Sequence, residues 1–155
     1  MTLQTEVELL RRIPLFANIE TSRLKLLAFT SERLAFDAGA TLFREGDRGD
    51  SAFLLLKGSV DIVVSSPNGP VVVATLNENN IVGEMALLCE MPRTATVVAK
   101  EPLDTLRIKK ELFFQMLRDI PQMTLEIMRE LAVRLHNVNK ELATAHAKLR
   151  ASGLE

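Results

Sequence analysis

Glycine positions divide this chain of 155 residues into three parts. Six of the seven glycines fall between Gly39 and Gly83, and the seventh is Gly153. Glycine suits tight turns and weakens helix interiors. We therefore expect short strands joined by turns in the middle of the chain, with helical segments on either side.

The middle part contains short runs of strand-forming residues separated by turn residues. The expected strands are Arg33–Phe36, Thr41–Arg44, Ala52–Leu56, Val60–Val64, Val71–Leu76, Thr94–Ala99 and Asp104–Ile108. Asn68-Gly69 lies between two β-branched runs and predicts a hairpin turn with positive φ at both residues. About eight short strands without long helices between them indicate a closed barrel or jelly roll.

Helical patterns flank these strands. A helix is expected over Glu20–Thr30 and another over Glu111–Asp119. Pro121 disfavours continuation of the second helix and suits the first turn of a third, which runs to about Lys148. In this third helix, apolar residues recur at alternating spacings of three and four, at Met128, Leu131, Leu135, Val138, Leu142, Ala145 and Leu149. This pattern predicts either a homodimer seam or a helix that lies on the barrel.

We expect one domain over residues 1–155, with an N-terminal helical segment (1–31), a β-roll (32–109) and C-terminal helices (110–150). The net charge of −1 does not favour a nucleic-acid backbone or an anionic membrane, and no apolar stretch is long enough for a membrane helix. The first residues do not resemble a secretory signal, and Cys89 is the only cysteine. We therefore expect a cytoplasmic protein without a metal, a cofactor, a nucleic-acid partner or a membrane contact.

Residues 83–97, GEMALLCEMPRTATV, have the chemistry of an anion site. A short helix is expected to begin at Glu84, and its free N–H groups suit an anion that the small Ala86 allows to approach. The planar fork of Arg93 can donate to two phosphate oxygens, and Thr94 adds a hydroxyl. The Glu84 carboxylate would repel a phosphate but could accept a hydrogen bond from a sugar hydroxyl. Together these groups indicate a compact nucleotide.

The pattern Gly-Glu-x-Ala-Leu followed by Arg-Thr-Ala-Thr-Val resembles the phosphate-binding cassette of the cyclic nucleotide-binding domain family. That family includes catabolite-activator regulators, regulatory subunits of cyclic-nucleotide-dependent kinases and cyclic-nucleotide-gated channels. Pro14-Leu15-Phe16, Glu45-Gly46-Asp47 and Gly58 also match it, and the resemblance covers about residues 10 to 138. It implies a mostly β fold: an eight-stranded β-roll with a short N-terminal helix, a cassette helix and two C-terminal helices.

The resemblance implies a role for individual residues. Glu84 would bind the ribose 2′-hydroxyl, and Arg93 and Thr94 would bind the cyclic phosphate together with the amides near Ala86 and Leu87. The expected ligand-binding set is completed by Gly83, Met85 and Ala95. In channel-type members an Arg on the final helix covers the purine. The matching residue here is Arg134, with Val138 one turn later as an apolar contact.

The resemblance implies a non-catalytic sensor that reports a cyclic mononucleotide through movement of its C-terminal helix. Thr94 is compatible with cGMP, but cAMP is slightly favoured, and the effector is not indicated. One alternative is the ligand-binding part of a catabolite-activator-type transcription regulator whose DNA-binding domain is absent from this chain. A scaffold with a vestigial pocket is disfavoured because Glu84 and Arg93 are intact. A cupin-type metalloenzyme is rejected because the two histidines, His136 and His146, lie in the helical tail.

Overall fold

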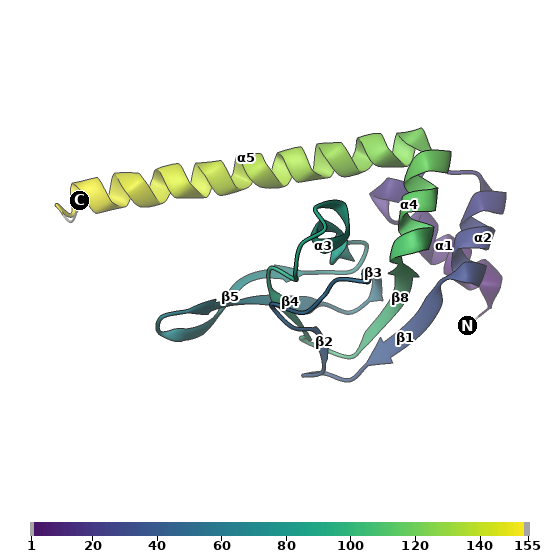
Figure 1. The fold of residues 1–155 in the computed structure, drawn as a ribbon, viewed down its shortest axis with the longest axis horizontal. Coiled ribbons are helices and arrows are strands. Elements are labelled where there is room, and N and C mark those ends of the chain that lie inside the picture. The colour runs from purple at the N-terminus through teal and green to yellow at the C-terminus, as the bar shows by residue number, and fades with distance from the viewer. Residues whose placement is uncertain (1, 154–155) are drawn as a thin grey trace. The chain divides into compact units, whose positions relative to one another are not determined.

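The computed structural model describes residues 2–153. By its internal contacts the chain divides into two compact units, one ending at Met116 and the other beginning at Leu117. The first unit contains the N-terminal helices, the strands, the cassette helix and most of the helix Lys110–Asp119. The second contains the end of that helix and the long helix Pro121–Ala151 (Figure 1).

The N-terminal segment is more helical than the sequence predicted. The helix α2 (Thr21–Thr30) confirms the predicted one, with Leu24, Leu27 and Ala28 buried. It is preceded by the helix α1 (Leu3–Arg11) and the 3₁₀ turn η1 (Pro14–Phe16), which the sequence analysis missed. The Thr2 hydroxyl accepts a hydrogen bond from the Thr5 N–H at 3.2 Å and caps α1, as threonine commonly does.

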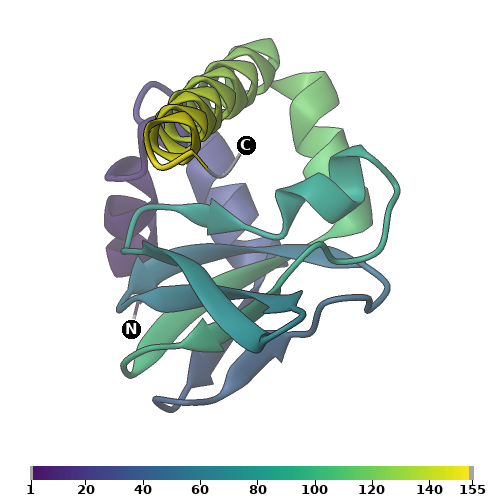
Figure 2. The same cartoon turned by 90° about the vertical axis from the view of Figure 1, so that its left-hand side faces the viewer.

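Within residues 2–153, eight strands form two four-stranded antiparallel sheets, which confirms the predicted β-roll (Figures 1 and 2). The strands are β1 (Glu32–Phe36), β2 (Thr41–Phe43), β3 (Ser51–Lys57), β4 (Val60–Ser66), β5 (Gly69–Leu76), β6 (Ile81–Val82), β7 (Thr96–Ala99) and β8 (Leu103–Lys109). Their orders are β1-β8-β3-β6 and β2-β7-β4-β5. The sequence predicted that a strand ends at Gly83, which β6 confirms, but it gave no range for this strand because two residues are too few to show an alternating pattern.

The β4–β5 hairpin forms where it was predicted, but its turn is displaced. The register pairs Ser66 with Gly69, so the two loop residues are Pro67 and Asn68. Gly69 has a φ of 105°, but Asn68 does not have a positive φ, so that part of the prediction is wrong. The physical reason is Pro67, whose fixed φ suits the first central position of a turn that has glycine at its last position.

A hydrophobic core fills the roll between the sheets. It consists of Phe53, Leu55, Val60, Val82, Val97, Ala99 and Leu103, all nearly inaccessible to solvent. Phe53 and Leu55 lie two residues apart and so share one face of β3. The opposite face of β3, with Ala52 and Leu54, is buried as well. The strand β3, which begins at the candidate site, is therefore packed on both faces.

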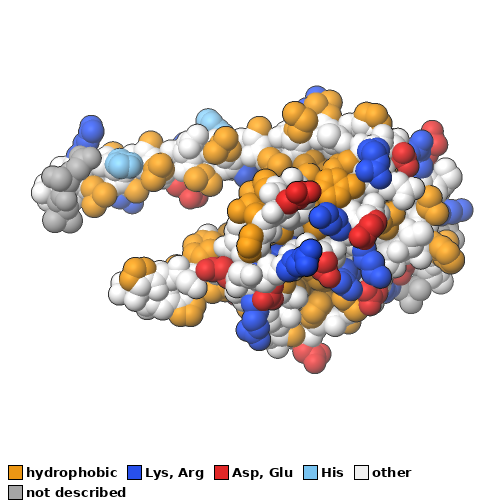
Figure 3. Space-filling view, in the orientation of Figure 1, with side chains coloured by type: hydrophobic (Ala, Val, Ile, Leu, Met, Phe, Trp, Pro, Cys, Tyr) orange, Lys and Arg blue, Asp and Glu red, His pale blue; other side chains and the backbone are white. Residues whose placement is uncertain are grey.

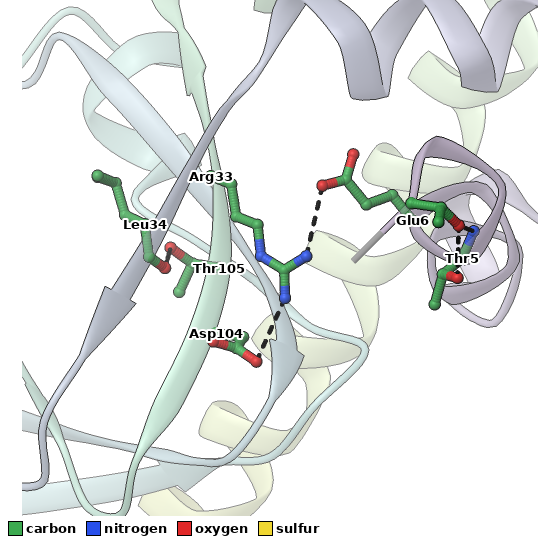
Figure 4. Close-up of polar contacts among 7 residues, drawn as sticks. Thr5, Glu6, Arg33, Leu34, Asp104 and Thr105 are labelled. Atoms are coloured by element: carbon green, nitrogen blue, oxygen red, sulfur yellow. Dashed lines mark hydrogen bonds and ion pairs between the residues drawn. The ribbon is translucent and has the colours of Figure 1, made fainter.

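Arg33 on β1 connects α1 with the first sheet (Figure 4). Its Nη1 lies 3.4 Å from Glu6 Oε1 and its Nη2 lies 3.5 Å from Asp104 Oδ2. Beside it, the Thr105 hydroxyl donates to the Leu34 carbonyl at 3.0 Å. Because Arg33 is 31% exposed, these ion pairs orient α1 more than they stabilise the fold.

The C-terminal segment contains α4 (Lys110–Asp119) and α5 (Pro121–Ala151), as predicted to within a few residues. Pro121 occupies the first turn of α5, whose 31 residues correspond to a length of about 46 Å. Exposed apolar side chains recur along α5, orange in Figure 3, and include Met128, Leu135, Val138 and Leu142. No helix within residues 2–153 is both long enough and apolar enough to span a membrane.

Candidate functional site

The cassette helix α3 (Glu84–Leu88) begins directly after β6, and Gly83 makes this transition. Gly83 has a φ of 86°, in the left-handed region that favours glycine. A Cβ at this position would lie 2.6 Å from Arg93 Nη1 and 3.2 Å from a ring carbon of Phe43. The conformation and the lack of space therefore both require glycine, and the group that approaches Gly83 is the guanidinium of Arg93.

Arg93 is buried, with 4% of its surface exposed, and is not a solvated loop residue. Its Nη1 donates to the Gly83 carbonyl at 2.8 Å, and its Nη2 donates to the Ser51 carbonyl at 2.6 Å. Its Cζ lies 4.0 Å from the centre of the Phe43 ring, in a cation–π contact. Its Nε has no hydrogen-bond partner among the described residues. A buried donor without an acceptor costs about 1–3 kcal/mol, so this position favours an incoming acceptor.

Arg93 is cationic despite its burial. Burial lowers the pKa of Arg93 and so does the nearby Arg107, while Asp50, Asp47 and Glu84 act to raise it. Because a guanidinium ionises far above neutral pH, Arg93 remains charged despite this lowered pKa. The site therefore presents a buried positive charge next to a helix N-terminus, an arrangement that attracts an anion.

The other predicted cassette residues differ in exposure. Glu84, Ala86 and Leu87 are buried, at 3%, 5% and 0% exposure. Met85 and Thr94 are exposed, and Ala95 is half-buried. The structure thus brings Gly83 against Arg93 and places Glu84 close enough to affect the pKa of that arginine.

The sequence analysis did not single out two residues of the site, Gly49 in the loop between β2 and β3 and Ser51 at the start of β3. A Cβ on Gly49 would lie 2.5 Å from Ala86 Cβ and 3.5 Å from Arg93 Cζ, so this loop packs directly on the cassette. The loop is also tied to the Arg93 backbone. The Gly46 N–H donates to the Arg93 carbonyl at 2.8 Å, and the Arg93 N–H donates to the Asp47 carbonyl at 2.8 Å. The signal that could have identified Gly49 is a second glycine three residues after Gly46.

Arg134 and Val138 lie on α5, in the second unit, whereas the cassette belongs to the first. Arg134 Nη2 donates to Glu130 Oε1 at 2.9 Å, one helical turn earlier. The Val138 side chain is 56% exposed. Within residues 2–153, no group of three or more His, Cys, Asp or Glu residues is placed to hold a metal ion.

A β-roll in which a buried arginine lies beside a short helix after β6 defines a class of ligand-binding domains. The family model of the cyclic nucleotide-binding domain matches residues 33–119, more than half of the chain. The chain belongs to this family and contains a cyclic nucleotide-binding domain.

Individual relatives agree with this assignment. The chain is 26% identical to a CRP-like cAMP-activated global transcriptional regulator of Mycobacterium tuberculosis, over 88% of this chain and 61% of that protein. It is 28% identical to the cGMP-dependent protein kinase egl-4 of Caenorhabditis elegans, over 72% of this chain and 15% of that protein. The crystal structure of the Thermus thermophilus catabolite activator protein superimposes with a TM-score of 0.76 at 28% identity, covering 84% of this chain and 62% of that one. The chain thus spans less than two thirds of the length of these relatives.

Proposed function

We propose that this chain is a non-catalytic sensor that binds cAMP, or less favourably cGMP, through residues 83–95. The observation that carries the proposal is Arg93, a buried cation whose Nε lacks an acceptor among the described residues, beside the N-terminus of α3. A cyclic phosphate diester carries one negative charge, which one guanidinium neutralises. The names of two relatives, one cAMP-activated and one cGMP-dependent, support both ligands.

Each cassette residue has a role in this proposal. Arg93, Thr94 and the amides of Ala86 and Leu87 bind the phosphate, and Glu84 accepts a hydrogen bond from the ribose 2′-hydroxyl. Gly83 gives the guanidinium room, while Met85 and Ala95 flank the ligand. The burial of Glu84 and Arg93 supports these roles, because hydrogen bonds to charged groups are stronger away from water.

The signal in this proposal is a movement of α5. A ligand shifts a helix only if it contacts the helix differently in its two positions. Stacking of Arg134 on the purine and packing of Val138 would supply those contacts. The single cysteine, Cys89, which is exposed, fits a protein that works in the reducing cytoplasm.

The likeness to the M. tuberculosis regulator over 88% of this chain supports an alternative. In that case the chain is the ligand-binding part of a catabolite-activator-type transcription regulator, and its DNA-binding domain is absent from this chain. Translation of the parent reading frame beyond residue 155 distinguishes the two, because a helix-turn-helix motif is expected there only for the regulator.

Calorimetric titration with cAMP, cGMP and 5′-AMP tests the proposed ligand class. We expect one cyclic nucleotide to bind per chain, and 5′-AMP to bind at least about tenfold more weakly, because burial of its second phosphate charge is not compensated. Equal affinity for 5′-AMP and cAMP would contradict a site built for a cyclic phosphate.

A further inference from the structure

Ser51, whose carbonyl accepts from Arg93 Nη2 at 2.6 Å, also takes part in a second set of polar contacts. Its hydroxyl accepts a hydrogen bond from Arg107 Nε at 3.0 Å and donates to Asp50 Oδ1 at 3.0 Å. Ser51 itself is 1% exposed, so the hydroxyl that makes both contacts is buried, although the Asp50 side chain is largely exposed. The backbone group that holds one arm of Arg93 is therefore itself held through its own side chain.

Arg107 is fixed from three sides. Besides Ser51, its Nη2 binds Asp50 Oδ2 at 3.1 Å and its Nη1 binds Glu32 Oε2 at 3.0 Å. Arg107 lies opposite Phe53 on β3 and opposite Glu32 on β1, so its side chain connects three neighbouring strands. All three nitrogens of the guanidinium group have partners, and the contact with the buried Ser51 hydroxyl is the one least exposed to water.

Asp50 completes the arrangement as a carboxylate. Partial burial acts to raise the pKa of Asp50, but the Ser51 hydroxyl and the Arg107 charge lower it more, so its pKa lies below the usual value. Asp50 attracts Arg93 as well, whereas Arg107 repels it. Without Arg107, the negative charge of Asp50 would act on Arg93 unopposed and compete with an anionic ligand.

We propose that Arg107 is a positioning residue for ligand binding, which acts on Arg93 through Ser51 and Asp50. The inference rests on the proposed function, because it concerns the affinity for a cyclic phosphate. It assigns Arg107 no contact with the ligand. Its role is to hold the Ser51 carbonyl, and with it the guanidinium of Arg93, in the orientation that the phosphate requires.

The test is a double-mutant cycle with cAMP as the ligand. Arg107→Lys keeps the charge but loses the forked contacts, and we expect it to lower the affinity of the otherwise wild-type chain by about fivefold to tenfold. In an Arg93→Lys background, the same change should lower the affinity by less than about twofold, because there is no guanidinium left to position. A merely structural role would produce the same factor in both backgrounds and would overturn the inference.

Two further variants test whether a loss of affinity arises from the positioning of Arg93, from a changed charge or from a damaged fold. Ser51→Ala removes the hydroxyl that connects Arg107 with Asp50 and leaves every charge in place, and we expect a loss of affinity similar to that of Arg107→Lys. Arg33→Lys is the matched control, because Arg33 lies on the same sheet with two carboxylate partners but without a contact to Ser51, and we expect wild-type affinity. Thermal unfolding of each variant monitors the fold.

The outcomes distinguish the inference from the function on which it rests. If the wild-type chain binds neither cAMP nor cGMP, the proposed function is wrong and the inference is wrong with it. If the wild-type chain binds cAMP and Arg93→Lys weakens binding, but Arg107→Lys and Ser51→Ala behave like Arg33→Lys, only the inference is overturned.

Discussion

Two buried residues of opposite charge, Glu84 and Arg93, dominate the site at the scale of single residues. A nucleotide offers an acceptor to the buried Arg93, whose Nε lacks one among the described residues, and a hydroxyl donor to Glu84. A phosphate oxygen can accept from Arg93, and a ribose hydroxyl can donate to Glu84. The pair therefore suits a ligand that carries both groups.

The role of Glu84 predicts discrimination by the sugar. We expect 2′-deoxy-cAMP to bind about tenfold or more weakly than cAMP, because it lacks the hydroxyl that donates to the buried carboxylate. Glu84→Gln should reduce that difference, since a hydrogen bond to a neutral amide is weaker than one to a carboxylate. Competition binding with the two nucleotides measures the ratio, and equal affinities in the wild-type chain would assign Glu84 a structural role.

Sequence reasoning identified the residues of the cassette but not the residues that hold them. Arg93 and Glu84 belong to a contiguous pattern, so their chemistry is visible along the chain. Ser51 and Arg107 are 56 positions apart, and their contact depends on the register between β3 and β8. No local pattern encodes a register, so this contact could not be predicted from one sequence.

At the scale of elements, the turn from β6 into α3 is the most constrained segment of the site. We expect Gly83→Ala to lower the free energy of unfolding by about 1–3 kcal/mol, because its φ of 86° is strained for alanine. The new Cβ would also displace Arg93 Nη1, so we expect cAMP affinity to fall by about tenfold or more. Denaturant unfolding and calorimetry measure the two effects.

Gly69→Ala is the matched control for Gly83→Ala. Gly69 also has a positive φ, of 105°, but a Cβ there would meet nothing within 4 Å. We expect a similar loss of stability with unchanged affinity. If both variants bind cAMP like the wild type, the contact between Gly83 and Arg93 does not contribute to binding.

The second element-scale prediction concerns α5. If Arg134 covers the ligand, cAMP should protect backbone amides from about Leu131 to Leu142 against hydrogen exchange in the wild-type chain, and Arg134→Ala should abolish this protection. Affinity should fall only modestly, because stacking on the purine contributes about 1–2 kcal/mol. Unchanged protection in Arg134→Ala would show that Arg134 is not the lid.

The elements themselves were largely predictable. Long periodic segments such as α2, α4 and α5 were recognised, because burial of one face imposes a regular pattern. The helix α1 was missed although Thr2 offers a cap and Val7 and Leu10 are both buried on it. The strand β6 contains only two residues, and its place depends on pairing with β3, which is not a local property.

At the scale of the whole molecule, the exposed apolar face of α5 concerns the assembly of two copies of the chain. The exposed apolar side chains of α5 include Leu135, Val138, Leu142 and Leu149, spaced three, four and seven residues apart. We predict a parallel homodimer through this face, because such a seam is typical of coiled coils. Light scattering at tens of micromolar should give twice the monomer mass, and a monomer mass with and without ligand would contradict the prediction.

Two substitutions locate the predicted interface. Leu142→Lys places a charge in the seam and should give a monomer. Thr144→Lys, two residues further along α5 and therefore on the opposite side of the helix, should leave the dimer intact. Equal masses for the two variants would place any interface elsewhere.

The central claim is that Arg93 binds the phosphate of a cyclic nucleotide, and calorimetric titration of Arg93→Leu with cAMP tests it most directly. Arg33→Leu is the control, since it removes a partly buried arginine whose ion-pair partners, Glu6 and Asp104, do not belong to the cassette. We predict that Arg93→Leu remains folded and binds cAMP about 100-fold to 1000-fold more weakly than the wild type, because the phosphate is left unpaired, while Arg33→Leu binds normally. Wild-type affinity in a folded Arg93→Leu variant would contradict the account.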